Sequence, residues 1–364
     1  MDYTQDQLFW IWLSRTPGLY GAQFLKLIDA VGEPENAWKM TETARSILKP
    51  DVYENLMADG DPSRMEIFFN RMEDAGICAL TLLHDEYPEP LRSIKDPPVT
   101  LYIHGAADRW NSKAIGIVGT RNASRDGLRA AYDIAKGLAE NGVCVISGMA
   151  RGIDSAAHNG CMEGGERTVA VLGGSADMIT SSENAQFADR IVKEGGSVIS
   201  EYPPGTPANK FYFPRRNRII SGMSAGVVLV EGGERSGALI TLNHAKEQDR
   251  VRFAVFCSMY SAHNVAPKKM LDDGAILVTG VDVILKHFSW REREQKSQPS
   301  KPSVELDAEG KTLMDLLSIQ EMSFDELCGS TGFAPPKLNS LLTILQMRGI
   351  IEQLPGKLYR AMYP

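Results

Sequence analysis

The chain has 364 residues, of which 43% are hydrophobic and 23% charged; these values are typical of globular protein, and the length predicts two or three domains. Its 39 basic and 46 acidic residues give a net charge of −7, which argues against bulk electrostatic attraction to nucleic acid. No apolar run approaches the roughly 18 residues of a membrane span, and the first residues lack the basic start and long apolar stretch of a secretory signal.

Residues 1–80 are expected to form a small N-terminal all-α domain, because Leu8, Ile11 and Trp12 and then residues 24–28 place apolar side chains at helical spacing. Between these runs, residues 16–21 (Thr-Pro-Gly-Leu-Tyr-Gly) resemble the hairpin of SAM/helix-hairpin-helix-like domains. Two interpretations stay open. The hairpin presents backbone N–H groups to a nucleic-acid phosphate, or it is a plain turn of a packing domain in acidic surroundings.

Residues 81–288 alternate strand-like and helix-like patterns, which predicts an α/β domain with a doubly wound, Rossmann-like, mostly parallel sheet. The expected strands are 115–118, 143–146, 168–172, 197–199, 226–230, 252–256 and 276–278. The expected helices lie near 126–141, 153–163, 183–195, 236–248 and 265–272.

Residues 289–304 are polar and charged and contain two prolines, so a flexible linker is expected there. Residues 305–364 predict three helices and a β-hairpin turned at Pro355-Gly356, the plan of a winged-helix domain. Ser323 and Glu326 have capping-box spacing and are expected to open the second helix. Because the module is acidic overall, a protein-contact or accessory role is favoured over sequence-specific DNA reading, which stays open.

Charge and cysteine placement refine this outline. Residues 1–84 carry 7 basic and 13 acidic side chains, whereas residues 85–288 carry 23 of each, so the neutral centre can hold a local basic patch. The five cysteines form no C-x-x-C pair, and the six histidines show no metal-ligand spacing. We therefore expect buried free thiols, a cytoplasmic location, no metal and no cofactor.

Two strand-to-helix junctions predict an anion site. Residues 115–121 (Ile-Gly-Ile-Val-Gly-Thr-Arg) and 145–154 (Val-Ile-Ser-Gly-Met-Ala-Arg-Gly-Ile-Asp) each end an apolar run in glycine beside a hydroxyl residue. Such junctions place backbone N–H groups and the positive end of a helix dipole at the carboxyl edge of the sheet, where phosphates bind. The candidate DNA-binding residues here are Gly119, Thr120, Arg121, Ser147, Gly148 and Arg151.

The first junction is not the dinucleotide fingerprint G-x-G-x-x-G, and no acid ends the following strand to hold a ribose. Bound NAD is therefore not expected. Arg121 is expected to fork onto phosphate oxygens, and a structural ion pair is its alternative role.

Residues 210–222 (Lys-Phe-Tyr-Phe-Pro-Arg-Arg-Asn-Arg-Ile-Ile-Ser-Gly) interleave cations with three aromatic rings. This composition suits single-stranded nucleic acid, because cations neutralise phosphates and flat rings stack on bases. The candidate contacts are Lys210, Phe213, Arg215 and Arg216. Asn217 and Arg218 are expected to brace the sheet edge from inside. In the alternative interpretation the rings are core and the arginines pair with the acidic flanks.

Residues 231–241 (Glu-Gly-Gly-Glu-Arg-Ser-Gly-Ala-Leu-Ile-Thr) close another strand and open a helix. Ser236, Gly237 and Thr241 are expected to add hydroxyl and backbone donors to the same anion site. A helix N-cap without a ligand is the alternative interpretation of this segment.

These blocks, in this order, resemble the DNA-processing protein A family (DprA/Smf). The resemblance begins in residues 87–105 (Tyr-Pro-x-Pro-Leu, then Asp-Pro-Pro, then Leu-Tyr-x-x-Gly) and continues through Gly-Thr-Arg at 119–121 and Ser-Gly-Met-Ala-Arg-Gly-Ile-Asp at 147–154. It ends with Phe-Pro-Arg-x-Asn-Arg at 213–218 and Arg-Ser-Gly-x-Leu-Ile-Thr at 235–241. One short motif alone is weak evidence for a family, but five motifs in the family's order are specific for it. The flanking domains match the long form of the family.

The resemblance implies a non-catalytic protein that binds and protects single-stranded DNA through its Rossmann-like domain and forms a homodimer through that domain. It also implies loading of the RecA recombinase during natural transformation. Two loops depart from the family pattern: residues 174–184 keep only Asn184 of a Tyr-Pro…Asn segment, and residues 257–266 lack the usual Pro-Gly and Gly-x-Asn. DNA affinity or contacts are therefore expected to differ from the family norm.

Two other classes of function are weaker alternatives. A nucleotide phosphoribohydrolase-like enzyme, acting on a phosphorylated nucleoside, carries Pro-Gly-Gly-x-Gly-Thr-x-x-Glu where this chain has residues 231–239. Leu239 stands in place of its closing acid, which weakens the enzyme hypothesis. A transcription factor acting through the winged helix is weakened by the acidity of that module.

Overall fold

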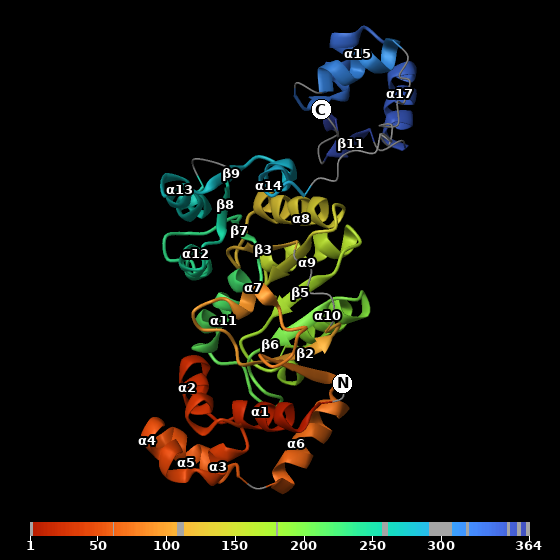
Figure 1. Ribbon diagram of the computed structural model, residues 1–364. Helices are drawn as coiled ribbons and strands as arrows, with labels where there is room; N and C mark the ends of the chain where they lie inside the picture. Colours follow the sequence, from red (N-terminus) through yellow and green to blue (C-terminus); the bar gives the residue numbers. More distant parts are fainter. Residues whose placement is uncertain are drawn as a thin grey trace. The chain divides into compact units, whose positions relative to one another are not determined.

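The computed structural model describes residues 3–60, 62–107, 113–179, 181–256, 261–290, 308–317, 320–347, 350–354 and 358–361. The chain divides into two compact units, Met1–Arg293 and Glu294–Pro364. The first unit contains a nine-stranded sheet with helices on both faces and a group of N-terminal helices (Figure 1).

The sheet is mostly parallel. Its parallel strands are β3 (Ala114–Val118), β4 (Cys144–Ser147), β5 (Thr168–Val171), β6 (Ser197–Ser200), β7 (Gly226–Leu229), β8 (Val251–Val255) and β9 (Ile276–Val278). The order across the sheet is β1-β2-β6-β5-β4-β3-β7-β8-β9. Every strand expected from the sequence is present, and the doubly wound α/β class is confirmed.

Helices cover both faces of the sheet (Figure 1). One face is covered by α8 (Arg125–Ala139), α9 (Ile153–Glu163), α10 (Ser182–Lys193) and α14 (Val281–His287). The other is covered by α7 (Glu89–Arg92), α11 (Tyr212–Gly222), α12 (Ala238–Glu247) and α13 (Val265–Asp272). Two short 3-10 helices, η1 (Ala176–Met178) and η2 (Ala262–Asn264), lie in loops of the described chain.

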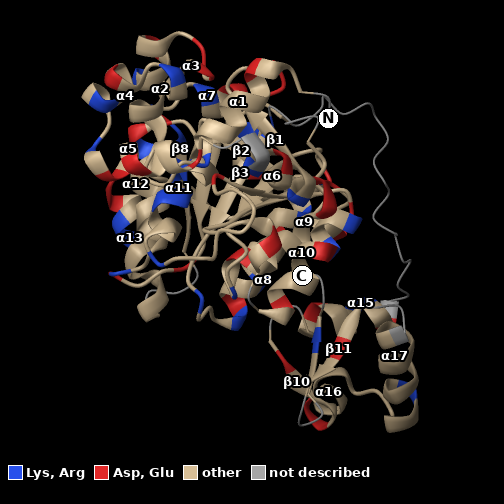
Figure 2. Cartoon of the chain, turned by 90° about the horizontal axis from the view of Figure 1, so that it is seen from below, with Lys and Arg blue, Asp and Glu red and all other residues tan. Residues whose placement is uncertain are grey.

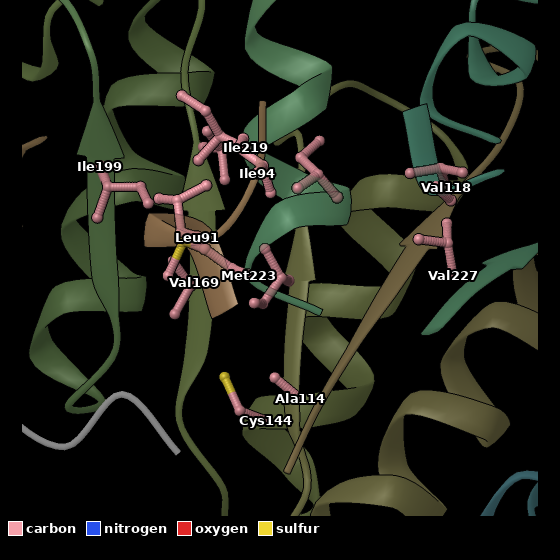
Figure 3. Close-up of a cluster of buried hydrophobic side chains, with 14 of the residues drawn as sticks. Leu91, Ile94, Ala114, Val118, Cys144, Val169, Ile199, Ile219, Met223 and Val227 are labelled. Atoms are coloured by element: carbon pink, nitrogen blue, oxygen red, sulfur yellow. The ribbon is translucent and has the colours of Figure 1, made fainter. Parts of the chain in front are cut away.

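The strands are continuous apolar runs because both faces of the sheet are buried. In β3, Ile115 and Ile117 pack toward α8 and α9, whereas Ala114 and Val118 belong to the core on the opposite face. Figure 3 shows this second core, to which α11 and its C-cap residue contribute Ile219 and Met223 and the sheet contributes Val118, Val169 and Val227.

The N-terminal helices pack on the antiparallel edge of the sheet. They are α1 (Gln5–Ser14), α2 (Gly21–Val31), α3 (Asn36–Lys39), α4 (Thr41–Ile47), α5 (Pro50–Ala58) and α6 (Pro62–Asp74). Trp10 donates its indole N–H to the carbonyl of Val99 at 2.9 Å, and the hydroxyls of Ser14 and Tyr102 lie 3.2 Å apart. The helices therefore share a core with the sheet.

Two strands of this edge were not expected from the sequence. β1 (Ile77–Thr81) pairs antiparallel with β2 (Thr100–Gly105), which pairs antiparallel with β6. β1 falls partly within residues 1–80, which were expected to be helical throughout. Its strand state depends on pairing with β2 about twenty residues later, and local periodicity does not report such long-range pairing.

The second unit has the winged-helix plan. It contains α15 (Ala308–Leu317), β10 (Met322–Ser323), α16 (Phe324–Thr331), α17 (Pro335–Met347), β11 (Ile351–Leu354) and β12 (Leu358–Ala361), and its strands form a separate sheet in the order β10-β12-β11. The expected capping box is present, since Ser323 and Glu326 exchange hydrogen bonds at the start of α16. Pro355, Gly356 and almost all of the expected linker lie outside the described residues.

Four of the cysteines are free thiols: Cys144 and Cys161 are buried, as expected, whereas Cys78 and Cys328 are only half-buried. Cys257 lies outside the described residues. None of the helices in the described part of the chain is long and apolar enough to cross a membrane.

Candidate nucleic-acid interface

A cavity of about 840 Å³ opens at the carboxyl edge of the sheet, above β3 and β7. The chain leaves these neighbouring strands in opposite directions, from β3 toward β4 and from β7 toward β8. Loops that diverge in this way leave a crevice, which is where open α/β sheets bind ligands. We call this cavity the switch-point cavity. Its walls come from the loop after β3, from α11 and from the loop between β7 and α12.

The loop after β3 places three predicted residues in the cavity wall. Gly119 lies so close to α9 that a Cβ would stand 2.5 Å from an isoleucine side chain. Thr120 donates its backbone N–H to the carbonyl of Glu231 at 2.8 Å, which ties this loop to the loop after β7. Arg121 is exposed, with its guanidinium carbon 5.9 Å from the centre of the Phe213 ring.

The positive ends of α8 and α9 are already occupied by carboxylates of the protein. Buried Glu231 accepts hydrogen bonds from the backbone N–H of Ser124 at 2.9 Å and from its hydroxyl at 2.6 Å, at the start of α8. Asp154, in the first turn of α9, accepts from the backbone N–H of Ala150 at 3.4 Å. Anion binding at this edge must therefore use side-chain cations more than these two helix dipoles.

A buried charged group forms the floor of the cavity. A Cβ on Gly148 would stand 2.6 Å from Nη2 of Arg216 and 2.7 Å from Oδ2 of Asp154. The Arg216 guanidinium also donates to the carbonyl of Gly148 at 2.9 Å. Burial raises the pKa of Asp154 to about 6 although Arg216 opposes the shift, and burial lowers the pKa of Arg216 to about 10. Arg216 is thus a cation at neutral pH, and the Gly148 carbonyl and the nearby Asp154 carboxyl fix its position.

Two further predicted residues follow β4. Ser147 is buried, and its hydroxyl donates to the carbonyl of Ile117 at 2.6 Å. Its side chain therefore braces β4 against β3 and does not face the cavity. Arg151 is exposed and donates to the side-chain oxygen of Asn122 at 3.0 Å.

A second cavity of about 310 Å³ continues the first one along the sheet edge. The two cavities share Arg121, Ala150, Phe213 and Arg216 in their walls. The second is also lined by Gly148, Arg151 and residues of the atypical 174–184 loop, among them Ser181 and Asn184. We call the two cavities together the edge groove.

One side of α11 and the turn before it supply the groove with a cation and one ring, Phe213, and place a second ring, Phe211, beside the cation. Lys210 lines the switch-point cavity, and its ammonium lies 5.1 Å from the centre of the Phe211 ring. Phe211 is 71% exposed, whereas Phe213 is half-buried between the two cavities. The third ring of the segment, Tyr212, stacks on Tyr202 at 3.9 Å. Phe211 is therefore the ring with the most free surface for a base.

The opposite side of α11 faces the N-terminal helices. Arg218 is buried and pairs with Glu201 at 2.6 Å and with Asp96 at 3.1 Å. Arg215 pairs with Glu201 at 3.2 Å and lies 4.4 Å from the centre of the Tyr20 ring. Arg218 braces the structure from inside, as expected. Arg215, which the sequence suggested as a DNA contact, belongs to the same ion-pair network and lines neither cavity of the groove.

The N-terminal hairpin meets this network. A Cβ on Gly21, the first residue of α2, would stand 1.7 Å from Oδ1 of Asp96. The amino end of α2 therefore faces a carboxylate of the central part of the chain. This placement favours a packing role for residues 16–21 over a phosphate contact.

The loop between β7 and α12, together with the first turn of α12, brings its predicted residues to the opposite wall. Ser236, Gly237 and buried Thr241 all line the switch-point cavity. The Ser236 hydroxyl accepts from the backbone N–H of Ala238 at 3.3 Å, and Gly237 is an N-cap without a side-chain hydrogen bond. Arg235, next to them, is exposed and lines the same cavity.

The switch-point cavity is also lined by Asn122, Asn217 and Arg235, which the sequence did not predict as DNA contacts. All three are direct neighbours of predicted residues, so proximity along the chain was the available signal. With Arg235 included, the described lining of the switch-point cavity contains four Lys or Arg side chains and one acid, Asp154.

Figure 2 shows basic residues on α11 within a molecule whose acidic residues are widely spread. Within the described ranges, no cluster of three or more His, Cys, Asp or Glu could hold a metal.

Fold and site together define a doubly wound α/β protein with a cation-lined crevice at its topological switch point and a separate winged-helix module. The chain belongs to the DNA recombination-mediator protein A family: the model of that family matches residues 79–289, and a DprA winged helix domain matches residues 297–357.

Individual relatives agree with this assignment. The chain is 37% identical over 219 residues to the DNA processing protein DprA of Bacillus subtilis, covering 60% of this chain and 73% of the relative. The X-ray structure of DprA from Streptococcus pneumoniae is similar at 31% identity and a TM-score of 0.67, covering 79% of this chain and 98% of that one. A Helicobacter pylori DNA processing protein A, whose structure concerns its single-stranded DNA binding mode, shares the fold at 22% identity and a TM-score of 0.52, over 58% of this chain and 95% of that one.

Proposed function

We propose that this protein binds single-stranded DNA in the edge groove without catalysing a reaction on it. The observation that carries the proposal is the placement of Arg121, Lys210, Arg216 and Arg235 around one cavity at the switch point of the sheet. Cations in a concave site attract the phosphates of a flexible strand and release its counterions.

The ring in the groove, Phe213, and the exposed ring next to Lys210, Phe211, support a single strand as the ligand. Phe211 exposes 71% of its surface beside Lys210, and unpaired bases stack on such a ring with about 1–3 kcal/mol per base. Bases within a duplex are already stacked and do not offer their faces. A relative of the same fold, DNA processing protein A of Helicobacter pylori, binds single-stranded DNA, which is consistent with this choice.

Binding is expected to prefer a single strand and to depend on salt. Fluorescence anisotropy of labelled oligo-dT and of an equal-length duplex measures both. Arg121→Ala and Lys210→Ala are each expected to weaken oligo-dT binding about tenfold, since a charge-assisted contact contributes about 1.5 kcal/mol. Log K should fall with log salt at about 0.7 per neutralised phosphate.

Lys136→Ala is the matched control, because Lys136 is an ion-paired surface cation in the last turn of α8, at the opposite edge of the sheet. It should bind like the wild type. Equal affinity for duplex and single strand, or an affinity that does not change with salt, would sink the proposal.

The first unit alone is expected to carry the site. A fragment ending at Arg293 keeps every residue of the edge groove and the whole compact unit. Its affinity for oligo-dT should stay within a factor of about three of the full chain, a difference of under 1 kcal/mol. If the fragment folds, as circular dichroism can report, and binding collapses, the DNA site lies in the winged-helix module.

The family suggests a finer role, which we include in the proposal: the protein dimerises through the central sheet and loads RecA recombinase on the bound strand in DNA uptake. RecA filament growth on single strands coated with single-strand-binding protein tests this role. The wild type is expected to accelerate growth, and Arg121→Ala is expected to do so weakly. An acceleration unaffected by Arg121→Ala would separate loading from the edge groove.

A further inference from the structure

A third cavity lies where the N-terminal helices meet the loop that follows β6. It has a volume of about 380 Å³ and is lined by Arg15 of the α1 end, by Arg64, Phe68 and Arg71 of α6, and by residues 203–206. Residues 1–84 contain only seven Lys and Arg side chains. Three of these seven therefore meet in one cavity of an otherwise acidic part of the chain, and local charge composition does not explain the gathering.

Two of the three arginines, Arg64 and Arg71, present their cationic ends to solvent, whereas the Arg15 side chain is only 19% exposed. Asp59 pairs with Arg15 at 3.2 Å and with Arg64 at 3.8 Å, and Asp177 pairs with Arg71 at 2.7 Å. The two carboxylate side chains are only 15% and 12% exposed, whereas those of Arg64 and Arg71 are 56% and 50% exposed. Three guanidinium groups thus share two shielded carboxylates, and solvent meets an excess of positive charge.

The arginines are also held in place before any ligand arrives. The Arg15 guanidinium lies 3.7 Å from the centre of the Trp12 ring and 5.0 Å from that of Phe68. Arg71 donates two hydrogen bonds to one oxygen of Asp177. Preorganised guanidinium groups lose little side-chain entropy when they bind phosphate oxygens. Beside them, Ile67 is 68% exposed and gives the cavity an apolar rim.

The third cavity and the edge groove lie on two sides of a strip formed by residues 175–178 and 205–208. Met178 and Ala208 line the edge groove, whereas Gly205 and Thr206 line the third cavity. Hydrogen bonds hold the two segments of this strip together. Ser175 donates its backbone N–H to the carbonyl of Thr206 at 2.9 Å. Asp177 accepts from the N–H of Gly205 at 3.0 Å and from Arg71. A strand that leaves the groove over this strip arrives at the arginines.

We propose that the third cavity binds backbone phosphates of the same DNA strand after it leaves the edge groove, so that the N-terminal helices lengthen the binding track. This inference rests on the proposed function of the groove. Its ligand chemistry is a run of phosphodiesters, since spaced, outward-facing guanidinium groups with one apolar rim suit a chain of phosphates and sugars.

Oligo-dT of increasing length tests whether the binding track continues from the edge groove to the third cavity. Wild-type affinity should rise with length beyond the shortest oligonucleotide that fills the groove, as the strand reaches Arg64 and Arg71. Arg64→Glu, a change at a half-exposed side chain, should leave the shortest oligonucleotide unaffected and abolish the gain from length. With long oligonucleotides the slope of log K against log salt should fall by about 0.7 for each lost phosphate.

Arg45→Glu is the matched control, because Arg45 is an exposed arginine of α4 that does not line the third cavity; its length series should match that of the wild type. A second variant, Arg64→Ala with Arg71→Ala, should also lose the gain, and thermal unfolding checks its fold. If Arg64→Glu keeps the full gain, the extension is wrong while the edge groove stands. If wild type binds no length of oligo-dT, both proposals fail.

Discussion

Arg216→Ala is expected to lower the free energy of unfolding by about 3 kcal/mol near neutral pH, because it leaves a buried carboxylate without its compensating cation. Arg216 and Asp154 are both buried, and both approach the same side of Gly148. The same change removes the floor cation of both groove cavities, so oligo-dT affinity should fall as well. Urea unfolding and anisotropy on one preparation measure the two effects.

The loss of stability in Arg216→Ala is expected to depend on pH. The pKa of Asp154 in the folded protein is raised from 3.8 to about 6, so its contribution to stability is present at low pH and declines as the pH rises through about 6. Arg216 limits this decline, because it favours the charged carboxylate. Without Arg216 the loss should therefore be small near about pH 5 and large near about pH 8.

Asp154→Asn in the Arg216→Ala background is the control that isolates the charge. The neutral amide needs no cation, so most of the stability lost at about pH 8 should return. DNA affinity should not return, because the floor cation is still missing. A loss of stability in Arg216→Ala that is the same at both pH values would mean that Asp154 is not the group that responds.

The sequence predicts the sheet well for a physical reason. Strands buried on both faces, such as β3 and β7, are continuous apolar runs between glycines and loops, and their alternation with helical patterns marks a parallel sheet. β1 and β2 escape prediction because their pairing joins segments that local patterns treat separately. The edge groove follows from the sheet, since residues after β3 and β7 must meet at the switch point.

Side-chain direction is what the sequence did not resolve. Ser147 stands beside predicted groove residues, yet it bonds Ile117 inside the sheet. Arg215 and Arg216 are adjacent in α11 and face opposite sides, toward Glu201 and toward Gly148. No helix was expected over residues 212–222. Once α11 is known, positions three apart share a side of the helix, so an inward Arg218 implies that Arg215 lies with it.

Glu201→Ala is expected to lower the free energy of unfolding by about 3 kcal/mol, because it removes the nearest partner of a buried guanidinium. The side chains of Arg218 and Glu201 are only 6% and 4% exposed, and their charged atoms lie 2.6 Å apart. Burial alone lowers the pKa of Arg218, but Glu201 and Asp96 raise it above its usual value, so Arg218 stays charged and needs a partner. Asp96 at 3.1 Å remains and keeps the loss near the lower end of the range for buried pairs.

The double variant Glu201→Gln with Arg218→Met separates charge from packing. It replaces the pair by side chains of similar volume without a net buried charge, so it should be more stable than Glu201→Ala in urea unfolding. If Glu201→Ala changes stability by less than about 1 kcal/mol, Asp96 alone satisfies Arg218 and the network is weaker than its geometry implies.

The same network joins the N-terminal helices to α11, since Asp96 faces the amino end of α2 and Arg215 lies over Tyr20. In Glu201→Ala, limited proteolysis should cut between the N-terminal helices and the sheet earlier than in wild type, because local opening follows the loss of buried contacts. DNA binding to short oligonucleotides should persist, since the groove side of α11 keeps Lys210, Phe213 and Arg216. If short-oligonucleotide binding were lost together with the docking of the helices, the two sides of α11 would have to act as one unit.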